Sequence, residues 1–256
     1  MKSHNKSERV NIYLSNLNDQ INLNMKSFIK IGHDYNIPEI TVRRDVKFLE
    51  KMGYLKIDMG LMNFVKNKDY EITRNEKLQT NKEKKQIIAI KANELISSSE
   101  IFVGPGTTCE TFIRAITKNI NVLYTNGMEI ARIANNSPNI HHVVIIGGRL
   151  RPQSTAMCGP IANRALETLK FAQSFITVTN VDQNLYLYNN HEDEAEFINN
   201  LINVTKETIC LIDSSKINNL VKGNLICNIE KINTLVVDKL PDEEILSKIP
   251  PTIKNV

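Results

Sequence analysis

The chain has 256 residues, of which 41% are hydrophobic and 23% are charged, the composition of a globular protein with room for two modest domains. It contains no run of eighteen apolar residues, and its first residues precede no apolar signal core. We therefore expect no membrane span and no secretion signal. A cytoplasmic protein is the expectation that follows. Its four cysteines lie far apart and predict reduced thiols rather than a zinc site or disulfides.

Charge is divided unevenly along the chain. Residues 1–91 contain 18 Lys and Arg against 11 Asp and Glu, a net charge of +7, whereas the remainder carries −3. A basic front and a slightly acidic back indicate that only the front meets a polyanion. A fluctuation of the Lys-rich composition is the alternative explanation.

Two short helices are predicted near the start. Residues 8–22 carry apolar side chains at helical spacing, and a second apolar pattern runs from Phe28 to Tyr35. The segment Asn36-Ile37-Pro38 follows it and leads into a third, basic helix. Short helices joined by a tight turn, with the basic one second in the pair, are typical of a helix-turn-helix.

The segment 37–55 is the most informative part of the chain. Val42, Val46 and Leu49 share one helical face. The opposite face is nearly all cationic, which a helix in the DNA major groove requires for contacts to phosphates and base edges. A solvated basic helix is the alternative interpretation. The residues expected to contact DNA are Thr41, Arg43, Arg44, Lys47 and Lys51.

This segment resembles the N-terminal DNA-binding domain of the DeoR family of bacterial transcriptional regulators. The family pattern Thr-Ile-Arg-Arg-Asp-Leu stands here as Thr-Val-Arg-Arg-Asp-Val over residues 41–46, followed by Leu49 and by Gly-Tyr-Leu over 53–55. We expect Asp45 to form an ion pair with Arg43 or Arg44. The chain departs from the family at Pro38, where a capping serine is usual, and over residues 56–60, where the wing usually reads Arg-x-His-Gly-Gly.

The resemblance and the change of pattern along the chain suggest the domain boundaries. We expect a winged helix-turn-helix over residues 1–62, a linker over 63–81 and an effector-sensing domain over 82–256. In the last range short apolar runs alternate with helical patterns, which predicts a parallel sheet covered on both faces, an α/β fold. The runs lie at residues 101–103, 122–124, 143–146, 175–178, 209–212 and 235–237.

Polar and glycine-rich segments follow four of these predicted strands. They are Gly-Pro-Gly-Thr-Thr at 104–108, Thr-Asn-Gly at 125–127, Gly-Gly-Arg at 147–149 and Asp-Ser-Ser-Lys at 213–216. Ligands of parallel sheets bind beyond the carboxyl ends of the strands, and glycines before a helix start favour an anion such as phosphate. A tight strand-to-helix turn is an equally good explanation of the first segment taken alone.

The same segments resemble the C-terminal sensor domain of the DeoR family. The resemblance implies a Rossmann-like fold related to ribose-5-phosphate isomerase, glucosamine-6-phosphate deaminase and CoA transferase, and a phosphorylated sugar or similar metabolite as effector. Three positions depart from the family: Gly104 replaces an acidic residue, Thr179-Asn180 replaces Asn-Gly, and Ile198 replaces a lysine. The residues expected at the effector site are Gly104, Gly106, Thr107, Thr108, Asn126, Gly148, Arg149, Asn180, Glu194 and Lys216.

Together with the resemblance, these features predict a DNA-binding repressor, and the resemblance implies that it controls carbohydrate metabolism genes. We expect a homodimer or homotetramer that binds a double-stranded operator and needs no metal or cofactor. One alternative is a sugar-phosphate isomerase, with a general base among Glu192, Asp193, Glu194 and Glu196 opposite Lys216. Another is a DNA-binding protein whose C-terminal domain only dimerises.

Overall fold

The computed structural model describes residues 6–17, 22–51, 54–64, 74–217 and 223–256. The chain divides into two compact units, an N-terminal unit over Met1–Ile72 and a C-terminal unit over Thr73–Val256. Each unit is described by itself. None of the helices in the described part of the chain combines the length and apolar character needed to cross a membrane.

The N-terminal unit consists of three helices followed by an antiparallel hairpin, the element order of a winged helix-turn-helix. Its interior is formed by the inward faces of all five elements, with Tyr13, Phe28 and Val42 fully buried. The elements are α1 (Lys6–Leu17), α2 (Met25–Asp34), α3 (Glu39–Lys51), β1 (Leu55–Asp58) and β2 (Leu61–Phe64). The segment before α2 adds to the hairpin, because the backbone of Leu23 exchanges two hydrogen bonds with that of Met62.

Local chemistry fixes the turns of this unit. Helix α2 begins with a capping box, in which Asn24 and Ser27 satisfy each other's backbone N–H groups. Helices α2 and α3 approach closely at Gly32, where an added Cβ would lie 2.5 Å from the Cγ2 of Val42. The hairpin turns through Met59 and Gly60, both with positive φ, as a two-residue turn between strands requires. Gly53, expected to follow the third helix, lies outside the described residues.

The expected pairing of Asp45 with Arg43 or Arg44 is wrong. Asp45 is 1% exposed and accepts two hydrogen bonds from Arg9 of α1, from Nε at 2.6 Å and from Nη2 at 2.9 Å. The Tyr13 hydroxyl donates a third, at 3.3 Å. Asp45 lies three residues after Val42 and four before Leu49, so it belongs to the inner face of α3. Arg43 bonds instead to Glu39, at 2.6 Å.

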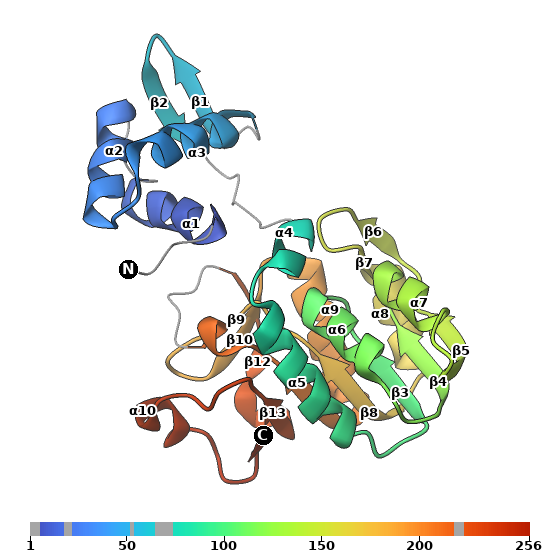
Figure 1. Ribbon diagram of the computed structural model, residues 1–256. Helices are drawn as coiled ribbons and strands as arrows, with labels where there is room; N and C mark the ends of the chain where they lie inside the picture. The colour runs from blue at the N-terminus through green and yellow to red at the C-terminus, as the bar shows by residue number, and fades with distance from the viewer. Residues whose placement is uncertain (1–5, 18–21, 52–53, 65–73, 218–222) are drawn as a thin grey trace. The chain divides into compact units, whose positions relative to one another are not determined.

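The C-terminal unit is built on a seven-stranded sheet in which every paired strand runs parallel, so the predicted α/β fold is confirmed (Figure 1). Six of its strands correspond to the predicted apolar runs. In hydrogen-bonding order the strands are β14 (Lys254–Asn255), β13 (Thr234–Val236), β11 (Thr205–Leu211), β8 (Phe171–Ile176), β3 (Glu100–Val103), β4 (Ile120–Thr125) and β5 (Ile140–Ile145).

Helices cover both faces of this sheet, and the alternation of β3 shows it: Ile101 and Val103 face one core, and Phe102 the other. The first core is closed by α5 (Lys82–Glu94), α6 (Thr107–Ala115) and α7 (Met128–Ala134). The second is closed by α8 (Pro160–Glu167), α9 (Glu192–Asn203) and the small antiparallel sheet described next.

Several smaller elements were not expected. A hairpin of β6 (Arg149–Arg151) and β7 (Ala156–Cys158) follows β5, and a second sheet joins β9 (Asn180–Val181), β10 (Tyr186–Asn189) and β12 (Asn224–Asn228). Three short helices, η1 (Ser214–Lys216), η2 (Ile229–Lys231) and α10 (Glu243–Leu246), complete the C-terminal half.

The expected linker over 63–81 needs correction. Its first residues belong to β2, and it contains a helix, α4 (Arg74–Gln79), that packs on the C-terminal unit beside α6. Residues 65–73 lie outside the described part of the chain. Helix α4 is short, and its Arg74 forms ion pairs with carboxylates of the C-terminal unit.

The buried ion pair between Asp45 and Arg9 yields a stability prediction. Asp45→Asn should lower the free energy of unfolding of the N-terminal unit by about 2–4 kcal/mol, because it replaces the buried anion that accepts two hydrogen bonds from Arg9 with a neutral amide. Hydrogen exchange of α1 and α3 in the intact chain measures this change. The matched control is Glu39→Gln, which breaks a pair whose side chains are 54% and 50% exposed and should cost at most about 1 kcal/mol. Equal effects of the two variants would contradict a structural role for Asp45.

Candidate functional site

The loop after β3 places a helix start at the carboxyl edge of the sheet. Gly106, the residue before α6, has φ of 124°, and an added Cβ would lie 2.5 Å from the Cγ2 of Thr177. No side chain caps α6, so its first N–H groups lack the side-chain acceptor that commonly serves them. Thr107 and Thr108 are buried in its first turn. We call Gly106, Thr107 and Thr108 the anion cradle, because free N–H groups at a helix start attract an anion.

Loops from neighbouring strands meet this cradle. Gly127 packs against it so closely that an added Cβ would lie 3.1 Å from the Cα of Pro105. Beside it, Asn126 is 2% exposed, and its Nδ2 donates to the Met157 carbonyl at 2.9 Å. The Oδ1 of Asn126 and the Oγ1 of Thr177 are buried and have no hydrogen-bond partner among the described residues. Buried polar atoms are normally paired, so these two atoms are candidate contacts for a bound molecule, either water or a ligand.

Two lysines contribute positive charge near the cradle. Lys216 of η1 donates to the Val178 carbonyl at 3.3 Å and lies 3.9 Å from the Oδ2 of Asp213. Burial lowers the pKa of Lys216, and Asp213 opposes this effect. Lys216 also acts electrostatically on Cys109 in the first turn of α6.

Lys85 was not expected at the site. It is 5% exposed, and burial, followed by the nearby charge of Lys216, lowers its pKa to about 8. A pKa near this value leaves the ammonium mainly protonated at neutral pH. Lys85 lies three residues before Ile88, which is buried, and this spacing places Lys85 on the inner face of α5. The sequence alone contains this signal.

A second group of charged residues joins the β6–β7 hairpin to the start of α9. Glu194 is buried and accepts hydrogen bonds from the Nη1 of Arg151, at 2.8 Å, and from the Ser154 hydroxyl. Arg149 pairs with Asp193. Residues of the hairpin and of the α9 start line a pocket of about 300 Å³. The buried Nδ1 of His191, at the edge of this pocket, has no partner among the described residues.

The predicted effector residues are distributed over the loop before α6, the β6–β7 hairpin with the start of α9, and the small sheet. Gly104 donates its backbone N–H to the Phe175 carbonyl at 2.9 Å and leads into the cradle. Gly148 packs on β7, where an added Cβ would lie 2.8 Å from the Cys158 carbonyl oxygen. Asn126 and Lys216 lie near the cradle, and Glu194 belongs to the charged group between the β6–β7 hairpin and α9. Arg149 is 71% exposed.

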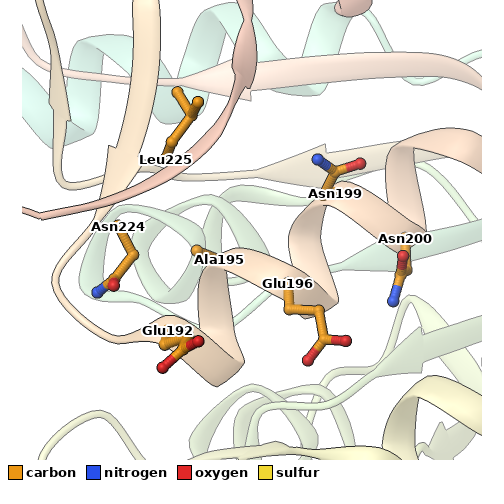
Figure 2. A pocket seen from close by; sticks show the side chains of 7 residues that line it. All are labelled: Glu192, Ala195, Glu196, Asn199, Asn200, Asn224 and Leu225. Atoms are coloured by element: carbon orange, nitrogen blue, oxygen red, sulfur yellow. The ribbon is translucent and has the colours of Figure 1, made fainter.

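Asn180 takes a different place. It lies in β9 of the small sheet, paired with Tyr188 of β10, and we find no hydrogen bond or ion pair from its side chain to the cradle among the described residues. The general-base candidates Glu192 and Glu196 are exposed and line another pocket, of about 360 Å³, with Asn199 and Asn200 (Figure 2). Among the described residues, no three His, Cys, Asp or Glu side chains gather as metal ligands would.

The predicted DNA-binding residues lie along the outer face of α3. Arg43, Arg44, Lys47 and Lys51 are exposed, and Thr41 is half-buried. Ile40 on the same face is 80% exposed, unusual for an isoleucine. The inner face carries Val42, Asp45, Val46 and Leu49. Helix α3 therefore presents its cations to solvent.

Comparison with known proteins identifies relatives of the chain. Residues 80–239 match the family described as the DeoR C terminal sensor domain. A lactose phosphotransferase system repressor of Staphylococcus epidermidis is 30% identical over 82% of this chain and 84% of its own. One of Staphylococcus aureus is 30% identical over 89% and 90%. An uncharacterized HTH-type transcriptional regulator of Bacillus subtilis, YulB, is 28% identical over 84% of each chain.

Among solved structures, ribose 5-phosphate isomerase A from Neisseria gonorrhoeae is 20% identical. It covers 60% of this chain and 58% of its own, with a TM-score of 0.37. A score of this size does not establish a shared overall fold.

The conformation of Gly106 gives a second prediction. Gly106→Ala should lower the free energy of unfolding of the C-terminal unit by about 1–3 kcal/mol, because the new methyl group meets Thr177 at a φ that alanine rarely adopts. Denaturant unfolding of the intact chain measures it. Gly147→Ala is the control, since nothing lies within 4 Å of its added Cβ. If both variants unfold alike, the loop is not constrained as described.

Proposed function

The chain belongs to the DeoR family, and we propose that it is a sequence-specific DNA-binding repressor of carbohydrate metabolism genes. A phosphorylated sugar or related metabolite bound at the cradle would control it. Its partners are then a double-stranded operator and the effector, and it works in the cytoplasm, where bacterial DNA lies.

The cationic outer face of α3 supports DNA binding. Arg44, Lys47 and Lys51 project from a helix whose opposite face is fixed in the core. A helix held in this way enters the major groove with a defined side, and its cations replace counterions on phosphates while arginine reads guanine. Arg43 is held by Glu39, which orients its guanidinium on the first turns of α3. We assign base contacts first to Arg44 and Lys47, with Thr41, Arg43 and Lys51 beside them.

The anion cradle supports an effector that carries a phosphate. Uncapped N–H groups, two threonine hydroxyls and the ammonium groups of Lys85 and Lys216 are matched to a small dianion. The unpaired Oδ1 of Asn126 is an acceptor, so it matches a hydroxyl donor on the same ligand. A phosphorylated compound with hydroxyl groups satisfies both. The names of the staphylococcal relatives, which join repression to a sugar phosphotransferase system, agree with this class.

The carboxylates near the site argue against an isomerase. Glu194 already accepts hydrogen bonds from Arg151 and Ser154, and Asp193 is paired with Arg149. These contacts hold both carboxylates on residues of the β6–β7 hairpin. Glu192 and Glu196 line the other pocket. We therefore propose that the chain is not an enzyme.

Helix-turn-helix proteins bind two half-sites through a two-fold symmetric pair of subunits. The proposed assembly is accordingly a homodimer, or a homotetramer formed from two such dimers.

The DNA-binding proposal predicts the effect of Arg44→Ala. The preference for the DNA upstream of the chain's own gene over scrambled DNA should fall by about 1–3 kcal/mol, because a bidentate contact to guanine is lost. Fluorescence anisotropy with both DNAs measures it. The control is Arg164→Ala, which removes an exposed arginine of α8 in the C-terminal unit. It should leave the affinity for both DNAs unchanged. Unchanged preference in Arg44→Ala would remove this residue from base recognition.

The effector proposal predicts the effect of Lys216→Met. Affinity for the sugar phosphate that binds the wild type should fall about tenfold or more, because a hydrogen bond to a charged group contributes about 1.5–3 kcal/mol. Calorimetric titration with a panel of pentose and hexose phosphates measures it. Lys170→Met is the control, since this exposed lysine precedes β8 at the amino edge of the sheet. If the two variants bind the sugar phosphate with equal affinity, its phosphate group does not lie beside Lys216.

A further inference from the structure

Arg74, the first residue of α4, bridges two carboxylates of the C-terminal unit. Its Nε and Nη2 donate to Glu110 at 2.7 Å and 2.6 Å, and Nη2 also contacts the Oε2 of Glu129 at 3.2 Å. Glu110 is 3% exposed, and the Arg74 and Glu129 side chains are 22% and 21% exposed. Two parallel hydrogen bonds between an arginine and a buried carboxylate form one of the strongest contacts available to a short helix.

Both carboxylates stand beside the anion cradle. Glu110 is in the first turn of α6, directly after Thr107, Thr108 and Cys109, and Glu129 is in the first turn of α7. A carboxylate on the first turn of the helix that holds a dianion repels that dianion, and burial strengthens the repulsion. The guanidinium of Arg74 cancels this charge as long as α4 remains in place.

The other end of α4 is attached by a residue of the site as well. The Nζ of Lys85 donates to the Thr80 carbonyl at 2.7 Å and to the Lys77 carbonyl. A cation at the last carbonyls of a helix stabilises its C-terminus. Lys77 of α4 is in turn close enough to Glu194 for the carboxylate to raise its pKa, against the lowering caused by desolvation. Both ends of α4 thus depend on charges that belong to the effector site.

We propose that Arg74 is a positioning residue of the effector site, and that the docked α4 and the bound anion stabilise each other. This inference rests on the proposed function, because it takes the cradle as the anion site. With Arg74 in place the charge of Glu110 is balanced and the anion binds; by thermodynamic reciprocity, the bound anion holds α4 more firmly.

The coupling has a direct route along the chain. Helix α4 begins two residues after the end of the N-terminal unit, at Ile72. In sequence, α4 is therefore the described element of the C-terminal unit that lies nearest to the proposed DNA-binding unit.

The experiment measures phosphate affinity and α4 protection together in the full-length chain. Inorganic phosphate is the probe, titrated by calorimetry at constant ionic strength, and hydrogen exchange is followed over residues 74–80. We expect phosphate to slow exchange in this segment of the wild type. Arg74→Ala should weaken phosphate binding about tenfold, within the usual range of coupling between sites, and should abolish the protection.

A rescue variant separates electrostatics from folding. In the double variant Arg74→Ala, Glu110→Gln, the repelling carboxylate is absent, so phosphate affinity should return to within about threefold of the wild type while α4 stays unprotected. Arg114→Ala, which removes an exposed arginine on the last turn of α6, is the control and should leave both readings unchanged.

Each outcome decides between the two proposals. Phosphate binding that is unchanged in Arg74→Ala, or binding without protection of α4 in the wild type, overturns the coupling and leaves the effector site intact. A wild type that binds neither phosphate nor any sugar phosphate overturns the effector site, and the coupling with it. Loss of phosphate binding that Glu110→Gln does not rescue reduces Arg74 to a merely structural role.

Discussion

The parallel direction of all seven strands is the constraint on which the C-terminal unit depends. Because α6, α7 and η1 follow β3, β4 and β11, they all begin at the carboxyl edge of the sheet. Helix α6 has no side-chain cap, so its first N–H groups lack a side-chain acceptor at that edge, whereas the N–H of Met128 at the start of α7 donates to the Thr155 carbonyl. A parallel sheet thereby concentrates positive partial charge at one edge. Lys85 and Lys216 add their side chains near this edge, which supports the proposed anion site.

Buried ion pairs then fix the parts that the sheet alone leaves undefined. Arg9–Asp45 joins α1 to α3, Arg74–Glu110 joins α4 to α6, and Arg151–Glu194 joins the β6–β7 hairpin to α9. A buried ion pair contributes little more to stability than an apolar contact would, but removing one of its two partners lowers the stability strongly. Such pairs therefore determine which elements meet. In the C-terminal unit the same pairs also set the charge near the cradle, so architecture and ligand electrostatics cannot be varied independently.

Features with a local cause were predictable from the sequence. The apolar stripe of α3 and the six strands follow from periodicity, and the glycine-rich strand ends follow from backbone sterics. The partner of Asp45 was not predictable in this way, because Arg9 lies 36 residues away and no spacing rule connects the two. The same separation, 36 residues, divides Arg74 from Glu110, so α4 was taken for linker. Lys85 has a local signal, its place on the buried face of α5, but a lysine at such a position is usually explained as packing.

The departures from the family pattern have different physical meanings. Ile198 is 6% exposed and packs in the core with Phe197 and Leu201, so an isoleucine there serves packing rather than ligand contact. Gly104 is different, because an added Cβ would meet only ordinary contacts, the nearest at 3.6 Å. Sterics do not demand glycine at this position. In the proposed effector site, a carboxylate at this position would add a negative charge that opposes binding of an anion, and glycine adds none. In that proposal a neutral acceptor, the unpaired Oδ1 of Asn126, takes a hydroxyl group of the ligand.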